Sequence, residues 1–274
     1  MRVLALLVGL LAASCSQAPA EVEARQHPTI VSLNPCSDAI LAEVADREQI
    51  LAISHFSQDP SSSSMELDDA RSYPAVSGSA EEVLALSPDL IVADEFVPAA
   101  TRAAFADLGL RLVQLPIVSS VEQAKQQVLN LARLAGHPER GRALNARIDA
   151  ALAQARPPLG DPVAAIVWQS GGIVPGRKTL VADMLERTGF AHLSATRGMR
   201  QADVLPLEAM LADPPQVIFS AGDPRSNEDR MLSHPALEAL DQTSRERFDR
   251  SLLWCGGPTI IRAAERLNAV RNSL

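Results

Sequence analysis

The chain has 274 residues, of which 47% are hydrophobic and 21% are charged, a balance typical of folded proteins and not of disordered ones. Its formal net charge is −8, which argues against the basic surface of a nucleic-acid-binding protein. Only 3% of the residues are aromatic. We therefore expect a core built mainly from Ala, Leu, Val and Ile, and the position of each aromatic residue becomes informative.

Residues 1–20 have the pattern of an export signal. An arginine precedes an apolar run over 3–13, and 18–20 (Ala-Pro-Ala) offers a small-residue cleavage site. The run is shorter than the roughly 20 residues that a membrane-spanning helix needs. Residues 12–15 also resemble a bacterial lipobox, in which case Cys15 carries a lipid anchor. Both forms are exported, so the sequence predicts a periplasmic protein, either free or membrane-tethered.

Residues 29–120 alternate between predicted strands and helices. Strands are predicted over 29–33, 50–54, 90–93 and 111–115; helices over 38–44 (with Ser37 as its cap), 80–86 and 98–108; and a serine-rich loop over 56–73. Strands that alternate with helices of about ten residues are typical of a parallel, doubly wound sheet. We expect this segment to form an N-terminal α/β lobe.

Residues 121–158 lack a strand signal and are predicted to be helical. The longest helix is expected over 138–155, where Pro138 and Glu139 suit a first turn. Leu144, Ile148, Ala151 and Leu152 fall on one face of it. A helix of this length spans roughly 27 Å, enough to link two lobes rigidly.

The alternation resumes in residues 159–274. Strands are predicted over 163–168, 217–219 and 251–254, and helices over 180–188, 207–212, 235–240 and 259–272. The chain is therefore predicted to be an α/β protein with two doubly wound lobes joined by one long helix. Ligands of such sheets bind beyond the carboxyl ends of the strands, which places the expected binding cleft between the lobes.

Motifs for nucleotide binding and hydrolysis are incomplete. The segment 171–179 (GGIVPGRKT) lies where a phosphate-binding loop would lie, but Arg177 breaks the pattern, so we expect a turn with Thr179 as the next helix cap. No G-x-S-x-G element is present. The five histidines are scattered, and we predict neither a catalytic centre nor a certain metal site.

Cys36 and Cys255 are the two cysteines outside the export signal. In an exported chain such a pair more often forms a disulfide than a metal site, and no C-x-x-C spacing supports the metal interpretation. His55 directly follows a predicted strand; an ordinary loop histidine and a ligand-binding residue both remain open.

The residues that follow the predicted strands form the candidate cleft. They are Asn34, Cys36, His55, Phe56, Asp94, Glu95, Phe96, Trp168, Gln169, Trp254 and Cys255.

The two halves share a local pattern. In each, a glutamate near a helix start is followed by an apolar helix, a proline and a strand: Glu81 with Pro88, and Glu208 with Pro215. The spacing by itself favours the interpretation that each segment is an ordinary helix-turn-strand unit, because glutamate suits the first turn of a helix.

Four segments and the long central helix carry a resemblance to a known family. The segments are TIVSLNPCSDAILAEV, SAEEVLALSPDLIVA, KTLVADMLERTGF and LPLEAMLADPPQVIF. They resemble the helical-backbone (class III) periplasmic binding proteins of ABC importers for cobalamin, ferric siderophores and haem. The resemblance covers nearly all of the mature chain. It implies two lobes joined by a rigid helix, a ligand held between them, and no catalysis. It also implies that Glu81 and Glu208 dock to arginines of the membrane permease, with Glu82 as the alternative to Glu81.

The resemblance implies a cobalt- or iron-containing chelate as ligand, no cofactor of the protein itself, and a monomer. The cleft departs from the family in having few tryptophans and tyrosines, with Asp94 and Glu95 where an aromatic residue is frequent. A bond between Cys36 and Cys255 would hold the lobes together, whereas a free thiol could instead bind the metal. An exported enzyme that uses the same cleft and a lipid-anchored binding protein without a transport function are the alternatives.

Overall fold

The computed structural model describes residues 26–157, 160–200, 202–222 and 227–274. The predicted export signal and Cys15 lie outside these residues. Within them, no helix combines the length and the apolar character needed to cross a membrane.

The N-terminal lobe is built on a parallel sheet of order β3-β2-β1-β4-β5. Its strands are β1 (Ile30–Ser32), β2 (Ile50–Ser54), β3 (Ala75–Val76), β4 (Leu90–Asp94) and β5 (Leu112–Leu115). Its helices are α1 (Pro35–Val44), α2 (Leu67–Arg71), α3 (Ala80–Leu86) and α4 (Ala99–Asp107), with 3-10 turns at Arg47–Gln49 and His55–Gln58. The order reverses between β1 and β4, and this switch point is where doubly wound sheets bind ligands.

The C-terminal lobe has a four-stranded parallel sheet of order β11-β10-β6-β8 and a separate antiparallel pair, β7 and β9. The strands are β6 (Val163–Gln169), β7 (Ile173–Pro175), β8 (Phe190–His192), β9 (Ala202–Val204), β10 (Val217–Ala221) and β11 (Ser244–Arg247). The helices are α7 (Leu180–Arg187), α8 (Leu193–Thr196), α9 (Leu207–Ala212) and α10 (Pro258–Ser273). Short 3-10 segments lie at Ser170–Gly172, Asn227–Ser233, Pro235–Leu237 and Arg250–Leu252.

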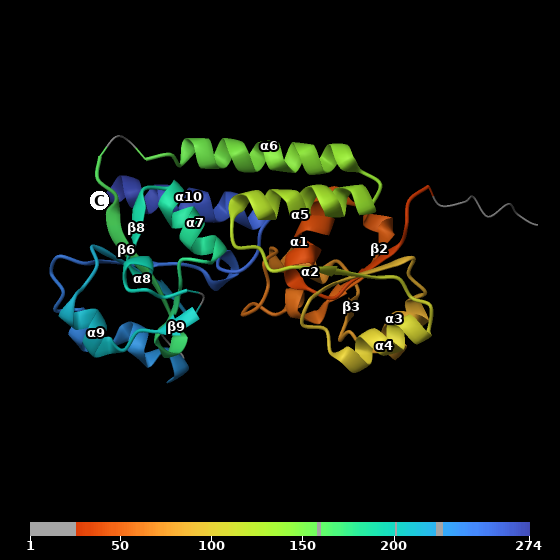
Figure 1. Ribbon diagram of the computed structural model, residues 1–274, viewed down its shortest axis with the longest axis horizontal. Helices are drawn as coiled ribbons and strands as arrows, with labels where there is room; N and C mark the ends of the chain where they lie inside the picture. Colours follow the sequence, from red (N-terminus) through yellow and green to blue (C-terminus); the bar gives the residue numbers. More distant parts are fainter. Residues whose placement is uncertain (1–25, 158–159, 201, 223–226) are drawn as a thin grey trace, which may run out of the picture.

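Two antiparallel helices, α5 (Val121–Leu134) and α6 (Pro138–Gln154), connect the lobes. Figure 1 shows α6 running along one side of the molecule over both lobes, with α5 beside it and α10 nearby. The predicted face of α6 is confirmed, because Leu144, Ile148 and Ala151 are buried and Leu152 is partly buried. Its 17 residues span about 26 Å.

One hydrophobic cluster runs through both lobes. It contains Ile30 and Leu90 from the N-terminal sheet, Val167 and Phe219 from the C-terminal sheet, and Ile148 of α6. Because interiors are close-packed, a shared cluster of this kind resists relative movement of the lobes. The predicted fold class, two doubly wound lobes linked by a long helix, is confirmed.

The core is built mainly from Ala, Leu, Val and Ile, as predicted. It also contains five fully buried aromatic residues: Phe105, Trp168, Phe190, Phe219 and Phe248. Three of them form edge-to-face contacts inside the C-terminal lobe, with ring centroids 5.2 Å apart for Phe190 and Phe219 and 5.7 Å for Phe219 and Phe248. A chain with few aromatic residues can therefore still bury most of them in its core.

Three predictions of local structure were wrong. α1 starts at Pro35 because Asn34, and not Ser37, is its cap: the Asn34 side chain accepts hydrogen bonds from the amides of Cys36 and Ser37. The apolar run 251–254 is not a strand, because its first two residues belong to the 3-10 turn Arg250–Leu252. The strand that precedes it, β11, is a polar edge strand. The expected helix over 235–240 is only the 3-10 turn Pro235–Leu237.

Candidate functional site

The switch point of the N-terminal sheet brings Asn34 and Asp94 together. Asn34 follows β1 and Asp94 ends β4, and the Asn34 side-chain amide donates a 2.7 Å hydrogen bond to Asp94 Oδ2. Asp94 Oδ1 accepts a 2.8 Å bond from the Phe96 amide. Both carboxylate oxygens are thus engaged within the protein, and these bonds fix the loop that carries Phe96.

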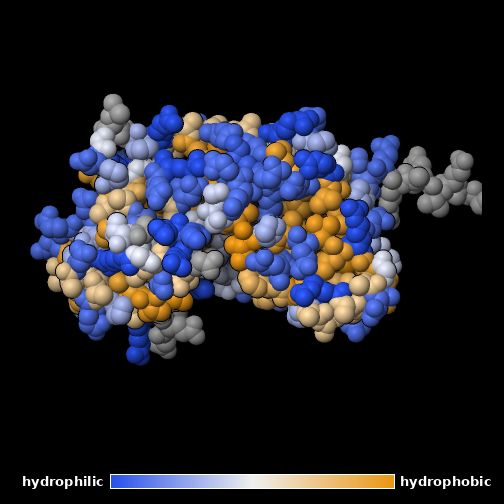
Figure 2. Space-filling model, viewed as in Figure 1, coloured by the Kyte–Doolittle hydropathy of each residue, from blue (hydrophilic) through white to orange (hydrophobic). Residues whose placement is uncertain are grey.

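Phe96, which follows β4, and Trp254, which follows the 3-10 turn Arg250–Leu252, border the same space. Both line each of two adjoining cavities, of about 220 and 350 Å³, and Ile117 and Val118 are the other residues common to both. Phe96 is 68% exposed, Ile117 56% and Trp254 57%, so three large apolar side chains present free surface here. Figure 2 shows hydrophobic residues on the N-terminal lobe beside the hollow that separates the lobes.

Polar groups border this apolar surface on both sides. Asn34, Asp94 and Gln127 line the smaller cavity, and Gln169, Lys178 and Thr179 line the larger one. Thr179 accepts a bond from the Ala182 amide as the cap of α7, which confirms its predicted function as a cap. An apolar cavity with a few polar groups of fixed orientation is the usual form of a small-molecule site.

Cys36 and Cys255 form a disulfide. The alternative of a thiol ligand to a metal is therefore wrong, because neither sulfur is a free thiolate. Cys36 borders the smaller cavity, while Cys255 is 3% exposed.

Trp168 does not face the cleft, and its prediction as a cleft residue was wrong. Its side chain is fully buried in a cluster on one face of the C-terminal sheet, with Ile166 and Ile218. Its indole donates a 3.2 Å hydrogen bond to the Leu205 carbonyl. Side chains alternate along a strand, so Trp168 points to the same face as Ile166, and Gln169, the last residue of β6, reaches the cavity.

His55, Phe56 and Glu95 lie outside the two cavities. His55 and Phe56 are exposed at the end of β2, with ring centroids 4.0 Å apart. Glu95 borders a separate, shallow surface pocket beside Arg102. These three residues are near the predicted edge of the sheet but are not gathered with Phe96 and Trp254.

Sequence reasoning missed Ile117, Val118, Gln127 and Lys178. Ile117 and Val118 follow β5, whose carboxyl end was not included among the strand ends although the same rule applies to it. Lys178 lies in the turn before α7, which was interpreted as a helix-capping turn and not as part of the cleft. Gln127 carries no local signal, because it reaches the cavity from the middle of α5.

Asp94 is the one acidic side chain among the described residues that line the two cavities. Among the described residues that line the two cavities there is no histidine, tyrosine, methionine or free thiol. Within the described part of the chain, the cluster of histidine and acidic residues close enough to hold an ion lies elsewhere: His27, Asp46 and His137.

Glu81 and Glu82 both lie in the first turn of α3 but differ in their contacts. Glu82 accepts hydrogen bonds from the Ser77 amide and hydroxyl at 2.8 and 2.5 Å, and these bonds lower the pKa of its carboxyl. Glu81 is exposed and makes no such bond in the described structure. Glu208 is likewise exposed in the first turn of α9.

A family model described as "Periplasmic binding protein" matches residues 30–245. A curated cobalamin-binding protein from Halobacterium salinarum is 24% identical over 170 residues, which cover 61% of this chain and 46% of that protein. The alignment thus spans about half the length of that relative.

Two solved structures are similar over most of both chains. A periplasmic heme-binding protein from Roseiflexus sp. RS-1, in apo form, matches with a TM-score of 0.69 and 21% identity, covering 89% of this chain and 97% of that one. The periplasmic vitamin B12-binding protein of Vibrio cholerae matches with a TM-score of 0.70 and 18% identity, covering 90% and 97%. At these identities the likeness establishes the fold.

Proposed function

The chain belongs to the periplasmic binding protein family, and we propose that it captures a metal chelate between its lobes in the periplasm and delivers it to the permease of an ABC importer. The observation that carries the proposal is the pair of exposed aromatic side chains, Phe96 and Trp254, that line one cavity. The names of the relatives, a cobalamin-binding, a heme-binding and a vitamin B12-binding protein, support a ligand of the macrocycle class.

The donor set favours a chelate whose metal already carries all its ligands. A haem iron in a protein is ordinarily held by an axial histidine, cysteine, methionine or tyrosine. The described lining of the cavities contains no such free group, and both oxygens of Asp94 are occupied by Asn34 and Phe96.

The polar groups favour a corrinoid within that class. A corrinoid has amide side chains around its ring, and Asn34, Gln127 and Gln169 can exchange amide hydrogen bonds with such a periphery. Lys178 is the one cation among the described residues lining the cavities, which suits a ligand of low charge better than a polyanion. The exposed apolar surface of Phe96, Ile117 and Trp254 would cover the macrocycle itself.

We predict that cyanocobalamin binds the protein more tightly than haemin or a ferric siderophore in isothermal titration calorimetry. Trp254→Ala should weaken binding by about tenfold or more, as the loss of an aromatic anchor worth at least about 1.4 kcal/mol would. Trp168→Phe is the matched control: the buried indole is replaced by another ring, and affinity should not change.

Two results would overturn the proposal. If none of the three chelates binds, the ligand class is wrong. If a chelate binds but Trp254→Ala and Phe96→Ala leave its affinity unchanged, the ligand does not occupy this cavity. Tightest binding of haemin would retain the chelate class and contradict the preference for a corrinoid.

A further inference from the structure

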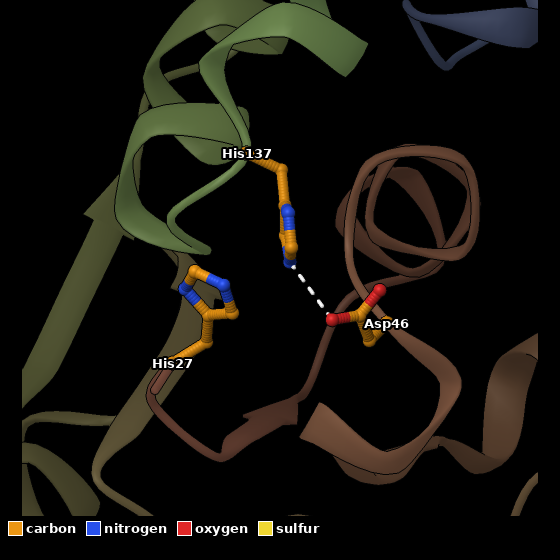
Figure 3. Close-up of side chains that lie close together, drawn as sticks. All are labelled: His27, Asp46 and His137. Atoms are coloured by element: carbon orange, nitrogen blue, oxygen red, sulfur yellow. Dashed lines mark ion pairs between the residues drawn. The ribbon is translucent and has the colours of Figure 1, made fainter. Parts of the chain in front are cut away.

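Three side chains with metal-binding atoms meet at the outer end of the N-terminal lobe. His27 belongs to the segment before β1, Asp46 follows α1, and His137 lies in the turn between α5 and α6. One possible ligand atom from each lies within 4.8 Å of the others. Figure 3 shows the two imidazole rings and the carboxylate close together, each on a different one of these segments.

The backbone at Gly136 allows this approach. Gly136 has φ +86°, and a Cβ atom there would lie 2.3 Å from Nδ1 of His27, closer than any side chain permits. The His27 ring therefore rests against bare backbone, and its centroid is 4.3 Å from that of the His137 ring.

A buried glutamine ties the three segments together. The Gln49 side-chain amide donates to the carbonyls of Pro28 and Ala135, at 3.0 and 2.9 Å. Its oxygen accepts 2.8 Å hydrogen bonds from the Asp46 amide and from Nε2–H of His137, and a metal bound at Nε2 would replace that proton. The neighbours of all three candidate ligands are thus fixed by one residue that is 5% exposed.

We propose that His27, Asp46 and His137 form a binding site for Zn²⁺. Two imidazoles and a carboxylate are a donor set that zinc prefers. Two ligands about 2.0–2.1 Å from a tetrahedral zinc are about 3.3 Å apart, and His137 Nε2 lies 3.2 Å from Asp46 Oδ2. All the candidate ligand atoms lie within 4.8 Å of one another, so zinc binding requires a shift of at most about 1.5 Å.

A neighbouring arginine orients the carboxylate of the cluster. Arg140 binds Asp46 Oδ1 at 2.6 Å, while Oδ2 faces His137. An outer partner of this kind commonly orients a ligating carboxylate.

Zinc at this position would connect the segment before β1 to the start of α6. The residues of the cluster line neither of the two interlobe cavities, so the site is distinct from that of the proposed transport ligand. A metal here would stabilise the attachment of the N-terminal segment to the lobe.

The test is titration of the metal-free protein with Zn²⁺ by calorimetry, together with its melting temperature. We expect one Zn²⁺ per chain and a higher melting temperature with zinc. His27→Ala and Asp46→Ala should each weaken Zn²⁺ binding at least about tenfold. Loss of a residue that only hydrogen-bonds to a metal ligand already lowers metal affinity by about tenfold or more. His234→Ala is the matched control, because His234 is an exposed helix cap in the other lobe.

His27→Ala removes a side chain at the edge of the fold, so its circular dichroism spectrum should match that of the wild type. Binding of Co²⁺ with the strong visible absorption of a tetrahedral complex would support the site independently. The proposal is overturned if the wild type binds no zinc, or if His27→Ala and Asp46→Ala bind it as tightly as His234→Ala does. The second result would place the zinc elsewhere, including in the interlobe cleft.

Discussion

Asp38 is a fully buried carboxyl group beneath the candidate cleft. It lies in the first turns of α1, and its Oδ2 accepts bonds from the Ser54 amide at 3.0 Å and the Ser57 hydroxyl at 2.6 Å. Desolvation raises its pKa from 3.8 to about 7, against the opposing effect of its hydrogen bonds to Ser32, Ser57 and Ser54. Asp38 thereby connects α1 to the turn that carries His55 and Phe56.

The raised pKa of Asp38 makes stability depend on pH. Between about pH 4 and pH 7 the folded chain holds a proton that the unfolded chain releases, so this carboxyl's contribution falls as pH rises, by up to about 1.4 kcal/mol per unit. Asp38→Asn keeps an acceptor oxygen but cannot titrate. The free energy of unfolding of Asp38→Asn, minus that of the wild type, should therefore increase as pH rises from about 4 to about 7.

Urea unfolding of Asp38→Asn and the wild type at about pH 5 and pH 8 measures this difference. Because the other titrating groups are common to both proteins, their effects cancel in the comparison. Equal differences at the two pH values would show that Asp38 does not titrate in this range.

At the scale of elements, α3 and α9 present a glutamate at the same place in their first turns. Figure 1 shows both helices on the side of the molecule away from α5 and α6. Glu81 and Glu208 are exposed, whereas Glu82 is held by Ser77. The contacts of Glu82 therefore favour Glu81 as the docking residue of the N-terminal lobe in our proposal of a permease partner. Two carboxylates on separate lobes would set the orientation of docking.

We predict that the double variant Glu81→Ala with Glu208→Ala loses chelate uptake in cells but keeps the ligand affinity of the wild type. Uptake of labelled cobalamin and calorimetry on the purified protein measure the two quantities. Glu82→Ala is the matched control, which should retain uptake. Loss of ligand affinity in the double variant, or equal loss of uptake in Glu82→Ala, would contradict the assignment.

At the scale of the whole molecule, the disulfide joins two distant parts of the chain. Cys36 and Cys255 are separated by 219 positions. The adjoining Gly257, with φ +65°, packs so closely on α1 that a Cβ would lie 2.5 Å from Ile40. The residues after the C-terminal sheet are thus fixed against the N-terminal lobe at the border of the smaller cavity.

Replacing both cysteines by alanine should lower the free energy of unfolding substantially. The chain-entropy model gives about 5 kcal/mol for a loop of this length, and measured losses are typically about 2–4 kcal/mol. Urea unfolding of the double variant provides the measurement, and wild type in reducing agent should behave in the same way. A double variant as stable as the oxidised wild type would show that packing alone holds this junction.

The sequence by itself determined the α/β class, most element positions, the long α6 and the division into two lobes. These features depend on local periodicity, helix capping and the alternation of strands with helices, which are properties of short stretches of sequence. The end of a parallel strand also has a local signal, so Asn34, Asp94, Phe96 and Gln169 could be assigned to the cleft. Family resemblance added the expected ligand class and docking glutamates.

Only the tertiary structure decided which side chains share a space. Trp168 and Gln169 are neighbours in sequence, yet strand alternation buries one in the core and turns the other to the cavity. The pairing of Cys36 with Cys255, and the meeting of His27, Asp46 and His137, bring together residues far apart in the chain. Such contacts depend on how whole elements pack against one another, and no local pattern specifies them.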